Sequence, residues 1–130
     1  MVESTRDARR LQLAIAAVFI VLGGWCVVAP GSIIALGVRP EYQTDHALVL
    51  ITMGAFGAQA MLAGVFAAFS QFTRRTFAAF GTAVLPFFVF DWWFYAVVPV
   101  FNAFILLDAL GNVVFIALSV RGYLILGDRA

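Results

Sequence analysis

Apolar residues gather into four long runs along the chain, and short polar stretches separate them. The runs cover about residues 11–29, 47–70, 77–98 and 101–122. A helix needs roughly 20 mostly apolar residues to cross the hydrocarbon core of a bilayer, and each run supplies about that many. The pattern therefore predicts an all-α, up-down bundle of four transmembrane helices that forms a single integral membrane domain over residues 1–130.

The breaks between the runs carry residues that end helices. Pro30 follows the first run, the stretch QFTRRT separates the second from the third, and Pro99 turns the chain into the fourth. The connection over residues 31–46 is the only long one. Its apolar first half is expected to lie along the membrane interface, and Thr44 or Asp45 is expected to cap the second helix.

The placement of arginine predicts how these helices are oriented. Arg39 stands alone on one side of the four-helix arrangement. The other side collects Arg6, Arg9, Arg10, Arg74, Arg75, Arg121 and Arg129. Because basic residues concentrate in cytoplasmic segments, we expect both termini in the cytoplasm and place the protein in a bacterial inner (plasma) membrane.

Composition supports the membrane class and excludes several kinds of chemistry. Hydrophobic residues make up 64% of the chain and charged residues 12%, whereas soluble domains average roughly 45–50% and about 25%. A net charge of +1 gives no basic field that would attract nucleic acid. Lysine is absent, which excludes lysine Schiff bases, and Cys26 is the single cysteine, which excludes thiolate clusters.

Two carboxylates interrupt the third and fourth runs. Asp91 lies seven residues before Val98 and Asp108 seven residues after Phe101, so at 1.5 Å per residue both lie about 10 Å inside the outer boundary. An ionised aspartate near the middle of a membrane helix costs roughly 2.5–3.5 kcal/mol, so such residues face the bundle interior or a cavity. The pattern predicts that the two acids meet and share a proton.

Neighbouring polar residues are expected to compensate the acids. Asn112 follows Asp108 by four residues and Tyr95 follows Asp91 by four, a spacing that places each pair on one helix face. Both side chains can donate a hydrogen bond to a carboxylate.

Three interpretations of the acid pair remain open. The acids can join helices by hydrogen bonding alone, or they can form a proton-coupled transport or cation site. They can also hold the polar end of an amphipathic ligand, a lipid, a quinone or a pigment, whose apolar body would lie among aromatic residues that include Trp92 and Trp93. No metal site is expected, because the single histidine, His46, lies at the outer end of the second helix.

Small residues form a stripe on the second predicted helix. Gly54, Gly57 and Gly64 lie on this stripe together with two alanines, and such a stripe lets another helix backbone approach closely. Gln59 lies on roughly the opposite side. We expect the glycines to pack inside the bundle; an interface with another protein or with a second copy is the alternative.

The runs LGGWCVVAPGSIIALGV and MGAFGAQAMLAGVFAAF, set within four short spans, resemble the small uncharacterised four-helix membrane proteins of bacteria, of the domain-of-unknown-function kind. This resemblance implies the fold and no activity.

The functional expectation is a non-enzymatic membrane component, either an accessory subunit or a binder of an amphipathic ligand. The alternative is a small proton- or cation-coupled transporter that acts as a homo-oligomer. An enzyme ranks last, because no nucleophile or metal cluster accompanies the acids, and no catalytic residue or cofactor is assigned. Membrane lipid is the expected surrounding, and a homo-oligomer or a larger membrane complex is the expected assembly.

Overall fold

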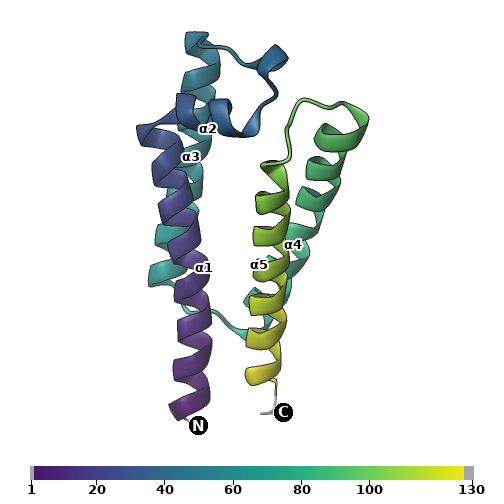
Figure 1. Ribbon diagram of the computed structural model, residues 1–130. Coiled ribbons are helices and arrows are strands. Elements are labelled where there is room, and N and C mark those ends of the chain that lie inside the picture. Colours follow the sequence, from purple (N-terminus) through teal and green to yellow (C-terminus); the bar gives the residue numbers. More distant parts are fainter. Residues whose placement is uncertain (1, 128–130) are drawn as a thin grey trace.

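The computed structural model describes residues Val2 to Gly127, and this part of the chain is helical throughout apart from its connections (Figure 1). Its long helices are α1 (Val2–Val28), α3 (Ala47–Phe69), α4 (Arg74–Trp92) and α5 (Ile105–Ile125). Each of the four is long and apolar enough to cross a membrane. The predicted set of four spanning helices is therefore confirmed.

Three short elements complete the described chain. They are α2 (Pro30–Gly37), the 3₁₀ turn η1 (Pro40–Tyr42) and the π-helical turn η2 (Trp93–Val97). The apolar first half of the long connection is thus a helix, which begins with proline at its first position, where the missing N–H costs no hydrogen bond.

The starts of the first and last helices differ most from the expectation. The first helix begins at Val2 rather than near residue 11, because hydropathy marks only the part of a helix that suits hydrocarbon, whereas the helix itself continues through polar residues. The last helix begins at Ile105 rather than at residue 101. Phe101 instead forms an isolated antiparallel bridge with Val38, and a turn at residues 103 and 104 follows before α5 begins.

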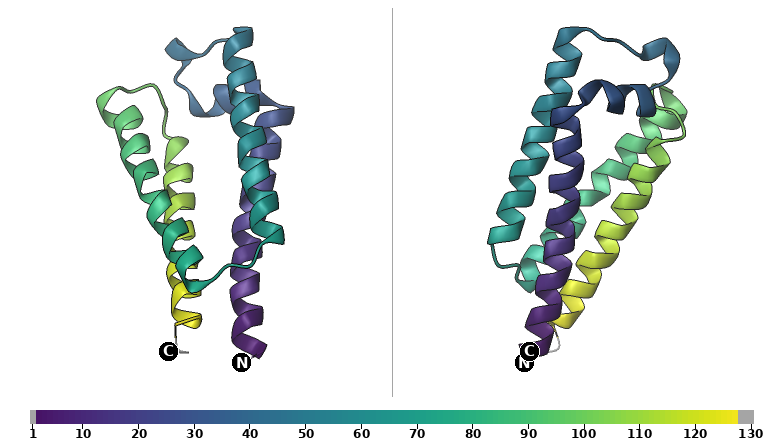
Figure 2. Two further views of the ribbon diagram at one scale, coloured as in Figure 1. Left: turned by 180° about the vertical axis from the view of Figure 1, so that it is seen from behind. Right: turned by 60° about the vertical axis from the view of Figure 1, so that its left-hand side comes forward.

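The four long helices pack as two pairs. α1 packs against α3 and α4 packs against α5, while α1 and α5 join the pairs. The pairs lie close together at the end where α1 begins and α5 ends, and they diverge toward the other end (Figures 1 and 2). Aromatic rings connect the pairs: Phe19 of α1 stacks on Phe115 of α5 at 5.2 Å and meets Phe80 of α4 edge-on at 6.0 Å.

Glycine makes the contact between α1 and α3 possible. A Cβ atom on Gly57 would lie 2.5 Å from the carbonyl oxygen of Gly23, and a Cβ on Gly64 would lie 2.9 Å from that of Ala16. The backbones approach too closely for any side chain there. Gly54 does not take part, because a Cβ at that position would meet nothing within 4 Å. Gly57 and Gly64 therefore lie in the α1–α3 contact, whereas Gly54 of the predicted stripe does not.

Polar side chains near the beginning of α1 hydrogen-bond to backbone groups at the end of α3. Gln12, with 2% of its surface exposed, donates to the carbonyl oxygens of Ala67 and Ser70 and accepts from the amide of Phe72. Arg9 donates to the carbonyl of Ser70 at 3.0 Å. These bonds satisfy carbonyls at the end of α3 that have no partner within the helix.

At the opposite end of the molecule, hydrogen bonds join the connection between α1 and α3 to the connection between α4 and α5. The Asn102 side chain donates to the carbonyl of Leu36 at 2.8 Å, and Arg39 donates through Nε to the carbonyl of Phe101 at 3.0 Å. α2 therefore lies across this end of the molecule and joins the two helix pairs (Figure 2). The cap of α3 also differs from the expectation: Nδ1 of His46, not Thr44 or Asp45, accepts from the amide of Leu48.

Substitution of Gly57 by alanine should destabilise the fold. The new Cβ would lie 2.5 Å from the Gly23 carbonyl oxygen and 2.6 Å from Cys26 Cβ, and such overpacking typically costs roughly 1–3 kcal/mol. The free energy of unfolding in mixed detergent, followed by circular dichroism, measures this loss.

Gly54→Ala is the matched control on the same helix. Its Cβ has open space, and alanine favours a helix over glycine by about 1 kcal/mol, so the variant should be as stable as the natural chain or slightly more so. Equal losses in the two variants would contradict the assigned α1–α3 contact.

Candidate functional site

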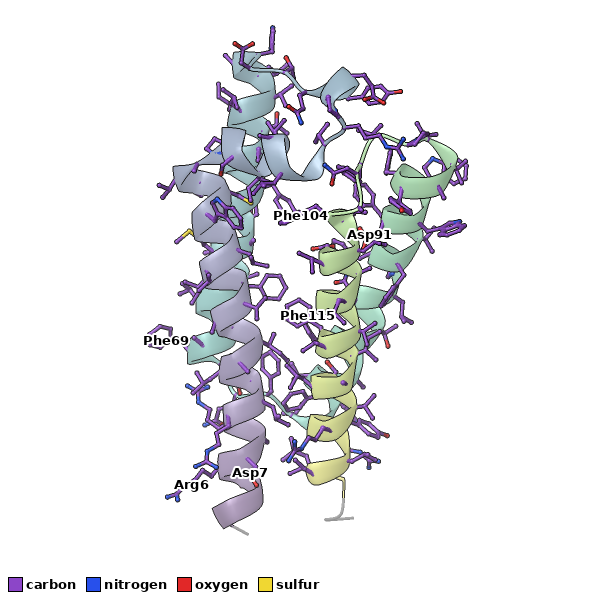
Figure 3. All side chains as sticks on the ribbon, viewed as in Figure 1. Arg6, Asp7, Phe69, Asp91, Phe104 and Phe115 are labelled. Carbon is purple, nitrogen blue, oxygen red and sulfur yellow. The ribbon has the colours of Figure 1, made fainter. Side chains whose placement is uncertain are left out.

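The face of α4 that meets α5 carries Asp91. The buried residues of α4 are Phe77, Val84 and Asp91, which follow one another at intervals of seven. Residues at this spacing share one helix face. Asp91 is therefore the last member of the stripe that packs on α5, and it lies toward the end of the molecule opposite Arg6 (Figure 3).

α5 supplies the partners of Asp91. Asn112 and Ser119, again seven residues apart, are buried residues of α5, and Asp108 lies one turn before Asn112 on the same side. The two stripes face each other, as the close approach of Gly81 and Ser119 shows. The α4–α5 contact thus places polar residues from both helices at one depth.

One amide joins the two acids. The Nδ2 group of Asn112 donates to Oδ2 of Asp91 at 3.2 Å and to Oδ2 of Asp108 at 3.2 Å. Asp91 and Asn112 are 5% and 6% exposed, whereas Asp108 is exposed. We call these three residues the Asp–Asn–Asp cluster; it has one buried and one accessible carboxyl group.

Within Val2–Gly127 no basic side chain forms an ion pair with the cluster. The ion pair found in that range joins Arg10 to Asp7, near the beginning of α1. Asp108 lies in the first turn of α5, where the partial positive charge of a helix N-terminus favours a carboxylate. The described chain compensates the acids through this partial charge, the Asn112 amide and the hydrogen bond between the two carboxyl groups.

The backbone changes its winding one residue after Asp91, where α4 ends at Trp92. Residues Trp93–Val97 form a π-helical turn, which ends with the amide of Val98 donating to the carbonyl of Trp93 at 2.8 Å. Such turns are rare and occur frequently at functional sites. The wider turn also shifts every side chain that follows it.

Three of the predicted site residues do not join the cluster. The structure shows no hydrogen bond between Tyr95 and Asp91 in the described chain; Tyr95 is half-buried within the π-helical turn, which breaks the regular four-residue spacing. Trp92, at the end of α4, and Trp93, at the start of η2, are 64% and 49% exposed. In a membrane these two rings would contact lipid rather than a ligand held between the helices.

A hollow of about 350 Å³ lies elsewhere, at the junction of the two helix pairs. It is lined by Phe19, Ala63, Phe66, Ala67, Ser70, Phe72 and Phe80. None of these residues belongs to the cluster, so this hollow and the two acids are separate features.

Two buried polar residues were not identified from the sequence. Gln12 closes the end of α3, as described above, and Ser119 is 2% exposed with a hydroxyl that has no hydrogen-bond partner among the described residues. Ser119 lies seven residues after Asn112, and this spacing could have indicated that both residues lie on the same face of α5. No sequence pattern indicated the role of Gln12, because its partners are backbone atoms distant in sequence.

Among the described residues, no three or more histidine, cysteine, aspartate or glutamate side chains are grouped so that they could hold a metal ion. His46 belongs to no such group. Comparison of the chain with models of protein families, with curated proteins and with solved structures found no match. The functional argument therefore depends on the geometry of the cluster itself.

Substitution of Asn112 by alanine should destabilise the α4–α5 pair. It removes the donor to Asp91, and a buried polar group left without its partner costs roughly 1–3 kcal/mol. Unfolding in mixed detergent measures the effect. Val113→Ala is the control, because Val113 is 52% exposed and adjacent in sequence. Losses of similar size in both variants would show that the amide contributes nothing specific.

Proposed function

We propose that the protein is a non-enzymatic integral membrane component that binds the polar end of an amphipathic ligand at Asp91, Asn112 and Asp108. In the proposed topology the four helices run up and down across a bacterial inner membrane with both termini in the cytoplasm. The arginines near the beginning of α1, at the α3–α4 connection and near the end of α5 support this orientation.

The observation that carries the proposal is the pair of carboxyl groups held by one amide without a basic partner. Asn112 donates to Oδ2 of each acid, and the two carboxyl groups also interact directly with each other. Acceptors in a low-dielectric region gain most from a donor that carries positive charge. A protonated amine on a long apolar chain satisfies that requirement.

The difference in exposure between the acids indicates how such a ligand would enter. Asp91 is enclosed between α4 and α5, whereas Asp108 is accessible in the half of the molecule where the helix pairs diverge (Figure 1). A polar end that approaches from this side meets Asp108 first. Asp91 would then act mainly by fixing Asn112, and through it the carboxyl group of Asp108.

Dodecylamine is a suitable probe for this site. Native mass spectrometry should detect one bound amine per chain, and the double variant Asp91→Asn with Asp108→Asn should bind it roughly tenfold more weakly, since a hydrogen bond to a charged group contributes about 1.5–3 kcal/mol. Asn has the same shape as Asp, so the fold should persist and its unfolding midpoint serves as a check.

Two controls make the result specific. Asp45→Asn removes an exposed acid outside the spans and should leave amine binding unchanged. Dodecanol has the same chain length without the charge and should bind the natural chain and the double variant alike. Equal retention of dodecylamine by the natural chain and the double variant would contradict the proposal.

A proton- or cation-coupled transporter is the second candidate. The observation that favours it is the short polar chain from an accessible acid through an amide to a buried acid, the kind of arrangement that membrane proton relays use. It requires a water path to Asp91, which a homo-oligomer could provide. Proton or cation flux into vesicles that is unchanged by Asp91→Asn together with Asp108→Asn would exclude it.

A further inference from the structure

α3 has one face packed on α1 and most of its circumference without a protein partner. Gly57 and Gly64 are its buried residues, and α3 buries the smallest share of its residues among the four spanning helices. Its only other substantial contact is with the short helix α2. In a membrane the remaining faces meet lipid or another protein.

The face opposite Gly57 and Gly64 carries a regular stripe of exposed residues. Their spacing alternates between four and three: Leu48, Thr52, Ala55, Gln59, Leu62 and Phe66. This average of 3.5 residues is the repeat that keeps one seam of a helix facing a neighbouring helix in a left-handed pair. We call these six residues the α3 stripe; Phe66, at its end, also lines the hollow.

Gln59 is the residue of the stripe that lipid cannot satisfy. It lies 12 residues from Ala47 and 10 from Phe69, so about 18 Å and about 15 Å of helix separate it from the two ends of α3. Its side chain is exposed and forms no hydrogen bond with the described residues. Thr52, the other polar member, already donates its hydroxyl to the carbonyl of Leu48 at 2.7 Å.

We infer that the α3 stripe is the interface of a parallel homodimer in which Gln59 of one chain hydrogen-bonds to Gln59 of a second copy. A primary amide carries both a donor and an acceptor, so two identical side chains satisfy each other. Copies inserted in the same orientation and related by a two-fold axis along the membrane normal place their α3 helices parallel and both amides at one depth. A single polar residue within an apolar seam also sets the register of such a pair.

This interface leaves the Asp–Asn–Asp cluster undisturbed, since the cluster lies between α4 and α5. The dimer is therefore independent of the proposed ligand, and either inference can fail without the other. Leu62 (50% exposed) and Phe66 (68% exposed) would supply apolar contacts beside the amides.

Disulfide crosslinking of the full-length protein in native membranes tests the stripe. In a Cys26→Ala background, which keeps the Cβ that contacts the Gly57 position, Leu62→Cys on the stripe should form a crosslinked dimer on mild oxidation. Val65→Cys is the matched control, since Val65 is 43% exposed against 50% for Leu62 but lies off the stripe. Absence of the Leu62→Cys dimer, or equal crosslinking at both positions, would overturn the inference.

A second measurement tests the role of the amide. Mass measurement in a mild detergent should show a dimer for the natural chain and for Gln59→Asn, and a dimer weakened about threefold or more for Gln59→Leu, the size expected for one interhelical hydrogen bond in a membrane. The thermal stability of the monomer should not fall in Gln59→Leu, because the side chain has no partner within the chain. A monomeric natural chain, or a Gln59→Leu dimer of unchanged affinity, would overturn the inference.

Discussion

Hydrocarbon offers no hydrogen-bond partner, so a polar group inside the membrane must find one in the protein. Within the helices, the backbone amides and carbonyls hydrogen-bond to each other. The few polar side chains must find partners elsewhere in the protein, and the architecture depends on how they do so. Gln12 does so by closing the end of α3, and Asn112 does so by joining Asp91 to Asp108. The buried hydroxyl of Ser119 and the exposed amide of Gln59 have no such partner among the described residues, and the exposed amide directs attention to the face of α3 that lies away from α1.

The two helix pairs use different means of association. α1 and α3 approach so closely at Gly57 and Gly64 that backbone meets backbone, and dispersion forces between well-packed surfaces hold them together. α4 and α5 instead combine aromatic and small residues at one end with the polar cluster at the other. The cluster lies in the half of the molecule where the two helix pairs diverge (Figure 1), and there Asp108 is exposed.

The connections limit how far the pairs can separate. Asn102 and Arg39 bond to backbone carbonyls across the end of the molecule, so α2 couples the α3 side to the segment between α4 and α5. The π-helical turn that follows Asp91 lies next to this connection.

The sequence by itself determined the four spanning helices, because hydropathy and length express the energetics of each helix separately. It also identified Asp91, Asp108 and Asn112, since charged and amide groups are costly in lipid wherever they lie. The spacing also predicted that Asn112 and Asp108 would pair, but the contacts with groups on other helices were decided by the tertiary structure. The structure showed that Gln12 bonds to a distant backbone, that Gly54 lies outside the α1–α3 contact, and that Tyr95 does not reach Asp91. These outcomes depend on the rotation of one helix against another and on a local change in winding, which are set by packing between segments far apart in the chain and leave no periodic signal along it.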